Sequence, residues 1–157
     1  MPRSAATAGA DAIGLVFYPP SPRYLSAERA VEIRDSLPPF VQTVALFVNP
    51  DAAQVAQVIG RVKPGLLQFH GEETPQFCAQ FGVPYVKACR VRPGVDLLEY
   101  LRPFSGAAAW LLDSFVEAYG GVGERFVVRF GRGIGPHADC AAAERLDSRR
   151  CLGGALL

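Results

Sequence analysis

The sequence lacks the features that mark several broad classes of protein. No two of its cysteines form a Cys-x-x-Cys pair, which argues against a zinc ribbon or a thioredoxin-like motif. The four cysteines are Cys78, Cys89, Cys140 and Cys151. No hydrophobic run approaches the roughly 18 residues of a membrane-spanning helix. The first ten residues contain no apolar segment of the kind found in secretory signals. We therefore expect a cytoplasmic protein with reduced thiols.

Charge of one sign is also scarce. Sixteen Lys and Arg residues oppose 15 Asp and Glu residues, so the 157-residue chain has a formal net charge of +1. This balance favours neither a nucleic acid nor an anionic membrane as a partner. Hydrophobic residues make up 50% and charged residues 20% of the chain, which excludes global disorder. The length suits one domain with a single core.

Short apolar runs alternate with helical patterns along most of the chain. The runs predict strands over residues 11–17, 41–48, 66–69, 85–91 and 108–112. Between them, polar residues suited to helix N-termini precede apolar residues at helical spacing: Ser26, Asp51, Thr74 and Asp96. Repeated strand–helix units indicate a parallel sheet. Two architectures fit this pattern, a flavodoxin-like doubly wound sheet and five-eighths of a (β/α)8 barrel.

The amino-acid composition and the pattern of apolar residues change after Phe126. Residues 127–157 are rich in arginine, alanine and glycine and contain no convincing strand–helix unit. One short helix from Asp139 to about Leu146 is the only regular element that the pattern supports. We therefore expect residues 1–126 to form the folded unit and residues 127–157 to be a divergent, irregular or disordered tail.

Polar side chains follow each of the predicted strands, where parallel sheets gather functional groups. They are Arg23, Asn49, His70, Arg90 or Arg92, and Asp113. Each also has a plain structural explanation, such as a solvated loop arginine, a turn asparagine or a histidine bonded to a loop carbonyl. Asp113 is the strongest candidate because it ends an apolar run and precedes a glycine-rich loop. A carboxyl group in that position could act as a general acid.

The remaining motifs are weaker. The Gly120-Gly121-Val122-Gly123 segment could approach an anion through its backbone, but it lacks the Gly-Lys-Ser/Thr of a P-loop. His137 and Cys140 have metal-ligand spacing but no second ligand pair, so no metal site is expected. Cys78 and Cys89 lie in apolar patterns and are expected in the core.

Taken together, the strings of residues resemble one known family, the phosphoribosylanthranilate isomerases of tryptophan biosynthesis. The resemblance runs from about Ala8 to Phe126, in the family's order and spacing. It is carried by Gly9–Tyr18 (GADAIGLVFY), Ser21–Ser26 (SPRYLS), Val44–Asn49 (VALFVN), Leu67–Gly71 (LQFHG), Leu111–Ser114 (LLDS) and the Gly120–Gly123 loop.

The resemblance implies a (β/α)8 barrel that catalyses an Amadori rearrangement without a metal or cofactor. N-(5'-phosphoribosyl)anthranilate would become 1-(2-carboxyphenylamino)-1-deoxyribulose 5-phosphate. By resemblance, Asp113 is the general acid and Arg23 binds the anthranilate carboxylate. His70 lies in the same mouth of the barrel and is expected among the substrate-binding residues. The loop glycines Gly120, Gly121 and Gly123 lie beside the acid and are expected to bind the substrate as well.

The sequence also departs from the family pattern at both ends. The family's first strand reads Lys-Ile-Cys-Gly, and its cysteine is the general base. Nothing comparable precedes Ala8, and none of the four cysteines stands in that position. After Phe126 the family's Asp-Trp string is replaced by Val127-Val128, a change that a frameshift would produce. We therefore expect an incomplete barrel that retains about strands two to six of eight.

Three hypotheses follow from these patterns. The first is an isomerase by descent whose activity is impaired. The second is a non-catalytic barrel fragment or degenerate gene product that self-associates through open strand edges. The third is an unrelated flavodoxin-like binding module, which would need a doubly wound strand order.

Overall fold

A computed structural model of the chain describes residues 2–91 and 96–114. The strands are β1 (Ala12–Val16), β2 (Gln42–Phe47), β3 (Leu66–Phe69), β4 (Tyr85–Val91) and β5 (Ala109–Ser114). The helices are α1 (Pro2–Thr7), α2 (Ala27–Ser36), α3 (Ala52–Val62), α4 (Pro75–Ala79) and α5 (Leu97–Leu101), followed by the 3-10 turn η1 (Arg102–Phe104). Strands and helices therefore alternate, as the sequence predicts.

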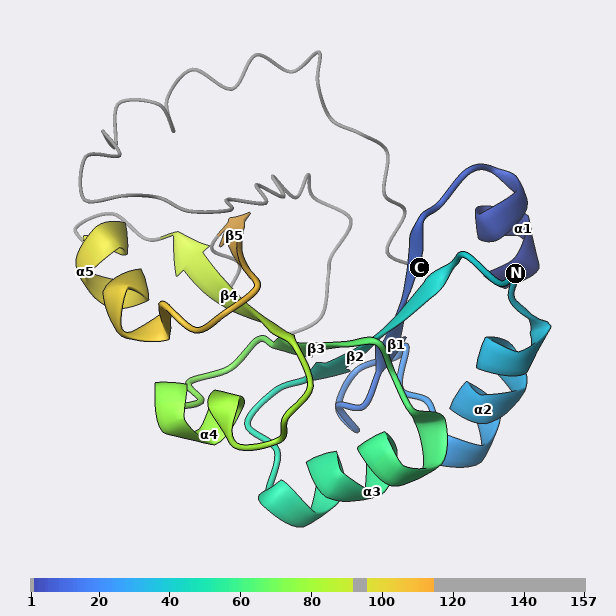
Figure 1. Cartoon of the computed structure of the whole chain (residues 1–157), viewed down its shortest axis with the longest axis horizontal. Coiled ribbons are helices and arrows are strands. Elements are labelled where there is room, and N and C mark those ends of the chain that lie inside the picture. The colour runs from blue at the N-terminus through green and yellow to red at the C-terminus, as the bar shows by residue number, and fades with distance from the viewer. Residues whose placement is uncertain (1, 92–95, 115–157) are drawn as a thin grey trace.

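The strands form one parallel sheet in the order of the chain. Its five strands run β1-β2-β3-β4-β5, and every neighbouring pair is parallel. Figure 1 shows α2, α3 and α4 following one another around the outside of the curved sheet. A doubly wound sheet would reverse its strand order at a switch point, and this one does not. The flavodoxin-like hypothesis is therefore wrong, and the incomplete barrel is confirmed.

Polar side chains begin four of the helices at the residues that the sequence suggests. The Asp51 carboxylate accepts a hydrogen bond from Gln54 N (2.7 Å), and the Asp96 carboxylate accepts from two amides at the start of α5. Ser26 and Thr74 act in the same way at α2 and α4. Each contact satisfies an amide that has no partner within its helix.

The two faces of the sheet carry different side chains. On the face covered by helices, aromatic rings stack from Phe17, which directly follows β1, to the ends of β2 and β3. The ring centroids of Phe17 and Phe47 are 5.6 Å apart, and those of Phe47 and Phe69 are 6.0 Å apart. The opposite face holds a small apolar cluster that includes Ala88 and Leu111. Because successive residues of a strand alternate between faces, Arg90 and Asp113 share the face of Ala88 and Leu111. We call this the inner face.

Most strand ends lie within one residue of the prediction, and two boundaries differ by more. β5 extends to Ser114, so Asp113 lies within the strand rather than after it. α4 ends at Ala79, although the apolar spacing that begins at Phe77 continues to Phe81 and a stop is expected at Gly82. The ring of Phe81 still stacks on Phe69, with centroids 6.2 Å apart, so burial rather than helical periodicity explains this apolar position.

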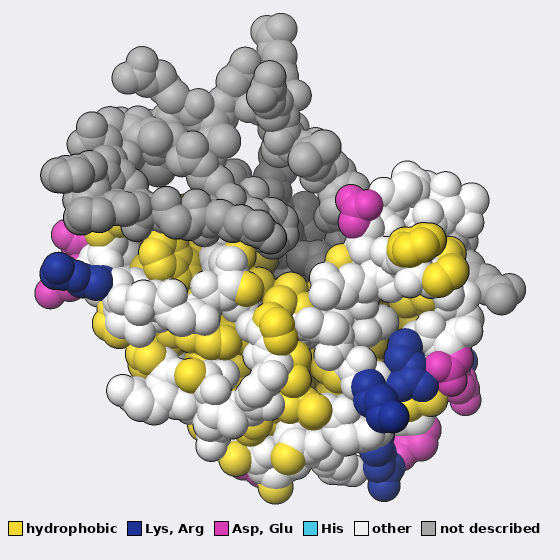
Figure 2. Space-filling view, viewed as in Figure 1, with side chains coloured by type: hydrophobic (Ala, Val, Ile, Leu, Met, Phe, Trp, Pro, Cys, Tyr) yellow, Lys and Arg dark blue, Asp and Glu magenta, His cyan; other side chains and the backbone are white. Residues whose placement is uncertain are grey.

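Charged side chains gather over α2 and α3 (Figure 2). Arg29 pairs with Glu32, Arg34 with Asp35, and Arg61 with Glu28, the last pair joining the two helices. These exposed pairs contribute little to stability, because solvent screens the charges. A helix long and apolar enough to span a membrane does not occur in the part of the chain that the structure describes.

Candidate active site

His70 and Asp113 come together at the carboxyl end of the sheet. His70 follows β3 and Asp113 lies near the end of β5, and the His70 Nε2 and Asp113 Oδ2 atoms are 2.9 Å apart. Their side chains are only 15% and 12% exposed. The backbone N–H of His70 donates to Phe47 O (2.9 Å), which ties the histidine to the end of β2. Two residues 43 positions apart in the sequence thus form one polar unit.

Gln68 fixes the other nitrogen of the imidazole. The Gln68 Nε2 atom lies 3.0 Å from His70 Nδ1, and Gln68 is 4% exposed. With the amide donating to Nδ1, a neutral ring carries its proton on Nε2 and donates it to Asp113. A line of hydrogen bonds therefore runs from Gln68 through His70 to Asp113 on the inner face.

One oxygen of Asp113 is left without a partner. Oδ2 contacts His70, whereas Oδ1 is buried and accepts no hydrogen bond from the described residues. Buried carboxylate oxygens are almost always hydrogen-bonded, so an exception calls for an explanation. The imidazole therefore holds the carboxyl group through Oδ2 alone, and Oδ1 has no partner among the described residues.

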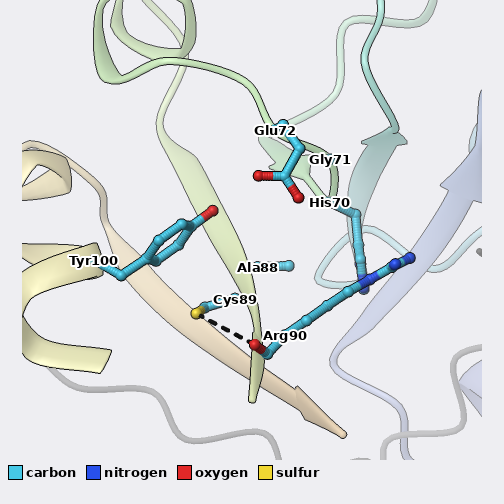
Figure 3. A pocket seen from close by; sticks show the side chains of 7 residues that line it. All are labelled: His70, Gly71, Glu72, Ala88, Cys89, Arg90 and Tyr100. Atoms are coloured by element: carbon cyan, nitrogen blue, oxygen red, sulfur yellow. Dashed lines mark hydrogen bonds between the residues drawn. The ribbon is translucent and has the colours of Figure 1, made fainter. Parts of the chain in front are cut away.

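A pocket opens beside this pair, around the end of β4. It is lined by His70, Gly71, Glu72, Ala88, Cys89, Arg90 and Tyr100. Figure 3 shows the Arg90 side chain extending toward His70, while Tyr100 of α5 lies on the other side of the strand. Arg90 is also the register partner of Asp113. The sequence pattern gives Arg90 or Arg92 as the candidate functional residue of this strand. Arg90 lines the pocket, and Arg92 lies outside the described residues.

Arg23 lies at the same edge of the sheet but further along it. It follows β1, which is separated from β5 by three strands in the sheet order. Its backbone N–H donates to Ser21 Oγ (3.1 Å), and a parallel bridge joins Val16 to Tyr24. The Arg23 side chain is exposed. The structure thus brings His70 and Asp113 into contact and leaves Arg23 at the rim.

Asn49 has a structural part in the site. Its backbone is left-handed (φ 47°), and its side-chain Oδ1 accepts from Glu72 N (2.7 Å). The loops after β2 and β3 meet here, and Gly71 is packed so closely that an added Cβ would lie 2.8 Å from Asn49 N. Only glycine allows this approach. The motif His70-Gly71 therefore combines a functional side chain with a steric requirement.

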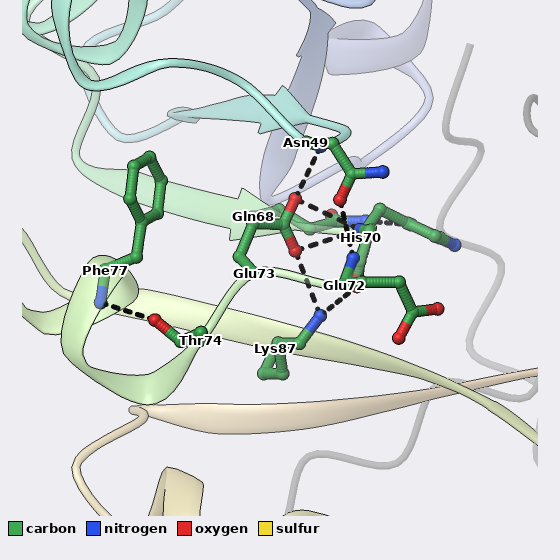
Figure 4. Close-up of polar contacts among 9 residues, drawn as sticks. Asn49, Gln68, His70, Glu72, Glu73, Thr74, Phe77 and Lys87 are labelled. Carbon is green, nitrogen blue, oxygen red and sulfur yellow. Dashed lines mark hydrogen bonds and ion pairs between the residues drawn. The ribbon is translucent and has the colours of Figure 1, made fainter.

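A buried ion pair lies beneath these loops. Lys87 Nζ is 3.0 Å from Glu73 Oε2, and the two side chains are 0% and 2% exposed. Lys87 also donates to Gly71 O, and its ammonium group lies 5.6 Å from the centre of the Phe104 ring. Figure 4 shows Glu73 between the backbone of Asn49 and the Lys87 side chain. The pair is on the helix side of the sheet, opposite the inner face.

The comparisons with known proteins decide the family. A family model described as N-(5'-phosphoribosyl)anthranilate (PRA) isomerase matches residues 3–130. The chain belongs to the phosphoribosylanthranilate isomerase family. Two relatives bearing that name come from Dechloromonas aromatica, 53% identical over 124 residues, and Alcanivorax borkumensis, 55% identical over 124 residues.

Solved structures of phosphoribosylanthranilate isomerases share this fold. The enzyme from Thermotoga maritima superposes with a TM-score of 0.68 at 37% identity, covering 78% of this chain and 60% of that one. An isomerase complex with reduced 1-(o-carboxyphenylamino)-1-deoxyribulose 5-phosphate gives a TM-score of 0.65, with 71% and 57% covered. The two curated relatives are matched over 78% of this chain but only 59% and 57% of their own lengths. The chain thus spans less than two thirds of the isomerases it matches.

The described cysteines do not resemble the family's catalytic base. Cys78 on α4 and Cys89 on β4 are both buried, and Cys78 packs in the core between the sheet and its helices. Burial raises the pKa of Cys78 to about 12 and that of Cys89 to about 11. Neither thiol supplies a thiolate near neutral pH. The expectation that both belong to the core is confirmed by their exposures of 0% and 1%.

Several predictions concern residues outside the described part of the chain. They include the helix expected from Asp139 and the change of composition at Phe126. The candidate residues among them are Gly120, Gly121, Gly123, His137, Cys140 and Cys151. Among residues 2–91 and 96–114, no group of three or more His, Cys, Asp or Glu side chains is arranged to hold a metal ion.

Sequence reasoning missed Gln68, Glu73 and Lys87. Each carries a signal that could have been read. Gln68 is a polar residue within the apolar run of β3 and, two residues before His70, on the same face of the strand. Lys87 is one of two lysines in the chain and interrupts the apolar run of β4. A lysine in a buried strand requires a partner, which topology then identifies as Glu73.

Proposed function

We propose that this chain acts on N-(5'-phosphoribosyl)anthranilate, as a phosphoribosylanthranilate isomerase, in the cytoplasm. The product would be 1-(2-carboxyphenylamino)-1-deoxyribulose 5-phosphate. The observation that carries the proposal is the buried Asp113 carboxyl group, oriented by His70 at the carboxyl end of the sheet with Oδ1 unpartnered. In parallel barrels this end of the strands carries the reacting groups. Residues 1–126 would be the working unit and residues 127–157 a divergent tail.

Asp113 would supply the proton that opens the sugar ring. Protonated on Oδ1, it would donate to the furanose ring oxygen while His70 holds Oδ2 in place. The bond between that oxygen and C1 breaks, and the anthranilate nitrogen forms a C=N bond to C1. Loss of the proton on C2 then gives an enolamine, which becomes the aminoketone. The reaction is an isomerisation, so its atoms and electrons balance within the substrate.

Arg23 would bind the anthranilate carboxylate. A guanidinium group presents two parallel N–H donors, which match a planar carboxylate. Its place on the loop after β1 puts it at the same edge of the sheet as Asp113. The substrate would then lie across the inner face, with its anthranilate end toward β1 and its sugar toward β5.

We expect slow turnover from this chain. Removal of the C2 proton needs a general base, and the two described cysteines are buried thiols with raised pKa values. A missing acid or base typically lowers a rate by ~10²–10⁴-fold. The chain should therefore retain substrate binding and ring opening better than it retains the complete rearrangement.

The test is conversion of the named substrate by the purified chain. Product is separated by chromatography and timed against buffer, for the natural chain, Asp113→Asn and Asp35→Asn. Asp35 is an exposed residue of α2 and serves as the matched control. We expect a rate above buffer for the natural chain and Asp35→Asn, and the buffer rate for Asp113→Asn. Equal rates for the natural chain and Asp113→Asn would refute the role of Asp113.

A second candidate is a non-catalytic, self-associating protein. Within residues 2–91 and 96–114, β1 and β5 each pair with a neighbour on one side only. Unpaired backbone groups at such edges can pair with another chain. This candidate predicts assembly through the sheet edges and no conversion of the substrate.

A further inference from the structure

Burial of the Glu73–Lys87 ion pair carries a cost in desolvation free energy. Both charged groups are removed from water, with 2% and 0% of their side chains exposed. Burying an ion pair costs desolvation energy that its attraction often fails to recover, so apolar residues of similar size would serve stability as well. The pair therefore calls for an explanation other than stability.

The hydrogen bonds of the pair converge on the loops that follow β2 and β3. Glu73 Oε1 accepts from Asn49 N (2.8 Å), and both Glu73 oxygens lie within 3.1 Å of Gly71 N. Lys87, in the middle of β4, holds Glu73 and the carbonyl oxygen of Gly71. The ends of β2 and β3 are thus joined to the middle of β4 through two side chains (Figure 4).

Gly71 is the link between this pair and the site. Its N–H is bound by Glu73 and its C=O by Lys87, so the peptide groups on both sides of the residue are held. His70 directly precedes it and has its own N–H bound by Phe47 O. With the backbone fixed on both sides, the imidazole has little freedom to leave Asp113 Oδ2.

We infer that Glu73 and Lys87 are positioning residues that hold His70 against Asp113. They lie on the helix side of the sheet, opposite the inner face, and act through the peptide groups of Gly71. Their importance for catalysis rests on the proposed function, because that function gives the His70–Asp113 contact its chemical role. The positional effect itself is a property of the protein without ligand.

The test uses the imidazole ring as a reporter. The chain has two histidines, so ring C–H spectra of the labelled full-length protein contain two sets of signals, and His137→Gln assigns them. Asp113→Asn gives the His70 signal expected when the carboxylate contact is changed. Glu73→Gln replaces a charged acceptor with an amide whose NH₂ opposes the N–H donors or the ammonium group around it. We expect Glu73→Gln to move the His70 signal toward its position in Asp113→Asn.

A second variant perturbs the same link without altering charge. Gly71→Ala forces the loops after β2 and β3 apart, since the added Cβ would lie 2.8 Å from Asn49 N. Gly60→Ala is the matched control, because a Cβ at Gly60 in α3 meets no atom within 4 Å. Val58→Ala, at a buried residue of α3, controls for a general loss of stability. We expect Gly71→Ala to shift His70 and both controls to leave it unmoved.

The results for these variants decide whether the Glu73–Lys87 pair positions His70. Folded Glu73→Gln or Gly71→Ala protein, by circular dichroism and Trp110 fluorescence, with an unmoved His70 signal would overturn the inference. If Glu73→Gln does not fold, Gly71→Ala decides alone. Unfolding of Gly71→Ala would also overturn it, since the link would then hold the fold rather than the histidine. A shifted His70 in a chain that does not convert the substrate would support positioning and reject only the proposed function.

Discussion

At the scale of single residues, the alternation of strand side chains sorts the polar groups into two sets. His70, Arg90 and Asp113 point to the inner face, where a ligand would lie. Lys87, one residue from Ala88 of the inner cluster, points to the helix side. One set is therefore available for chemistry, and the other joins loops beneath it. A register shift of one residue would exchange the two sets.

The role proposed for Arg23 predicts a loss of affinity. Arg23→Met keeps much of the side-chain length and removes the charge. Charge-assisted hydrogen bonds are worth ~1.5–3 kcal/mol. We therefore expect the binding of reduced 1-(o-carboxyphenylamino)-1-deoxyribulose 5-phosphate to weaken by ~10–150-fold. Calorimetric titration measures it. Arg29→Met, from an exposed ion pair on α2, is the control and should bind like the natural chain.

The site was only partly predictable from the sequence. Strand ends identify His70 and Asp113 as members of one mouth, because parallel strands end at the same edge. The 2.9 Å contact between them depends on strand order and register, which the sequence does not contain. The partnership of Glu73 and Lys87 similarly depends on the loop after β3 folding back over β4.

At the scale of the elements, a row of aromatic rings joins the strands to their helices. Phe47 is fully buried and stacks between Phe17 and Phe69. Local signals predicted these strands within one or two residues, because each is a short apolar run bounded by proline, glycine or asparagine. The end of α4 was not predictable, since Phe81 continues the apolar spacing while lying outside the helix.

This row predicts a large difference between two phenylalanine variants. Phe47→Ala should lower the free energy of unfolding by ~3–5 kcal/mol, the range for removing a buried aromatic side chain. Phe40→Ala should change it by less than ~0.5 kcal/mol, because Phe40 is 97% exposed. Urea unfolding monitored by circular dichroism compares the two. Similar midpoints for both variants would contradict the proposed core.

At the scale of the whole molecule, the described sheet is an open arc of a barrel. Its strands follow one another in order, and its helices follow around the outside. The family relationship explains this order, since each strand–helix unit of a barrel adds beside the previous one. The edges formed by β1 and β5 are the places where further strands would pair.

Open edges predict self-association. Light scattering after gel filtration, run over a series of concentrations, should give masses above the 16.9 kDa of one chain that rise with concentration. Mass that stays at one chain throughout the series would argue against assembly through β1 and β5.

The central claim is that the mouth formed by His70 and Asp113 binds the ligand of the isomerase family. The most direct measurement is a titration of the labelled chain with reduced 1-(o-carboxyphenylamino)-1-deoxyribulose 5-phosphate, the compound bound in a related isomerase. The account predicts a saturable shift of the His70 ring signals and a higher dissociation constant for Arg23→Met. Unchanged His70 signals at the highest concentration of the compound would contradict it.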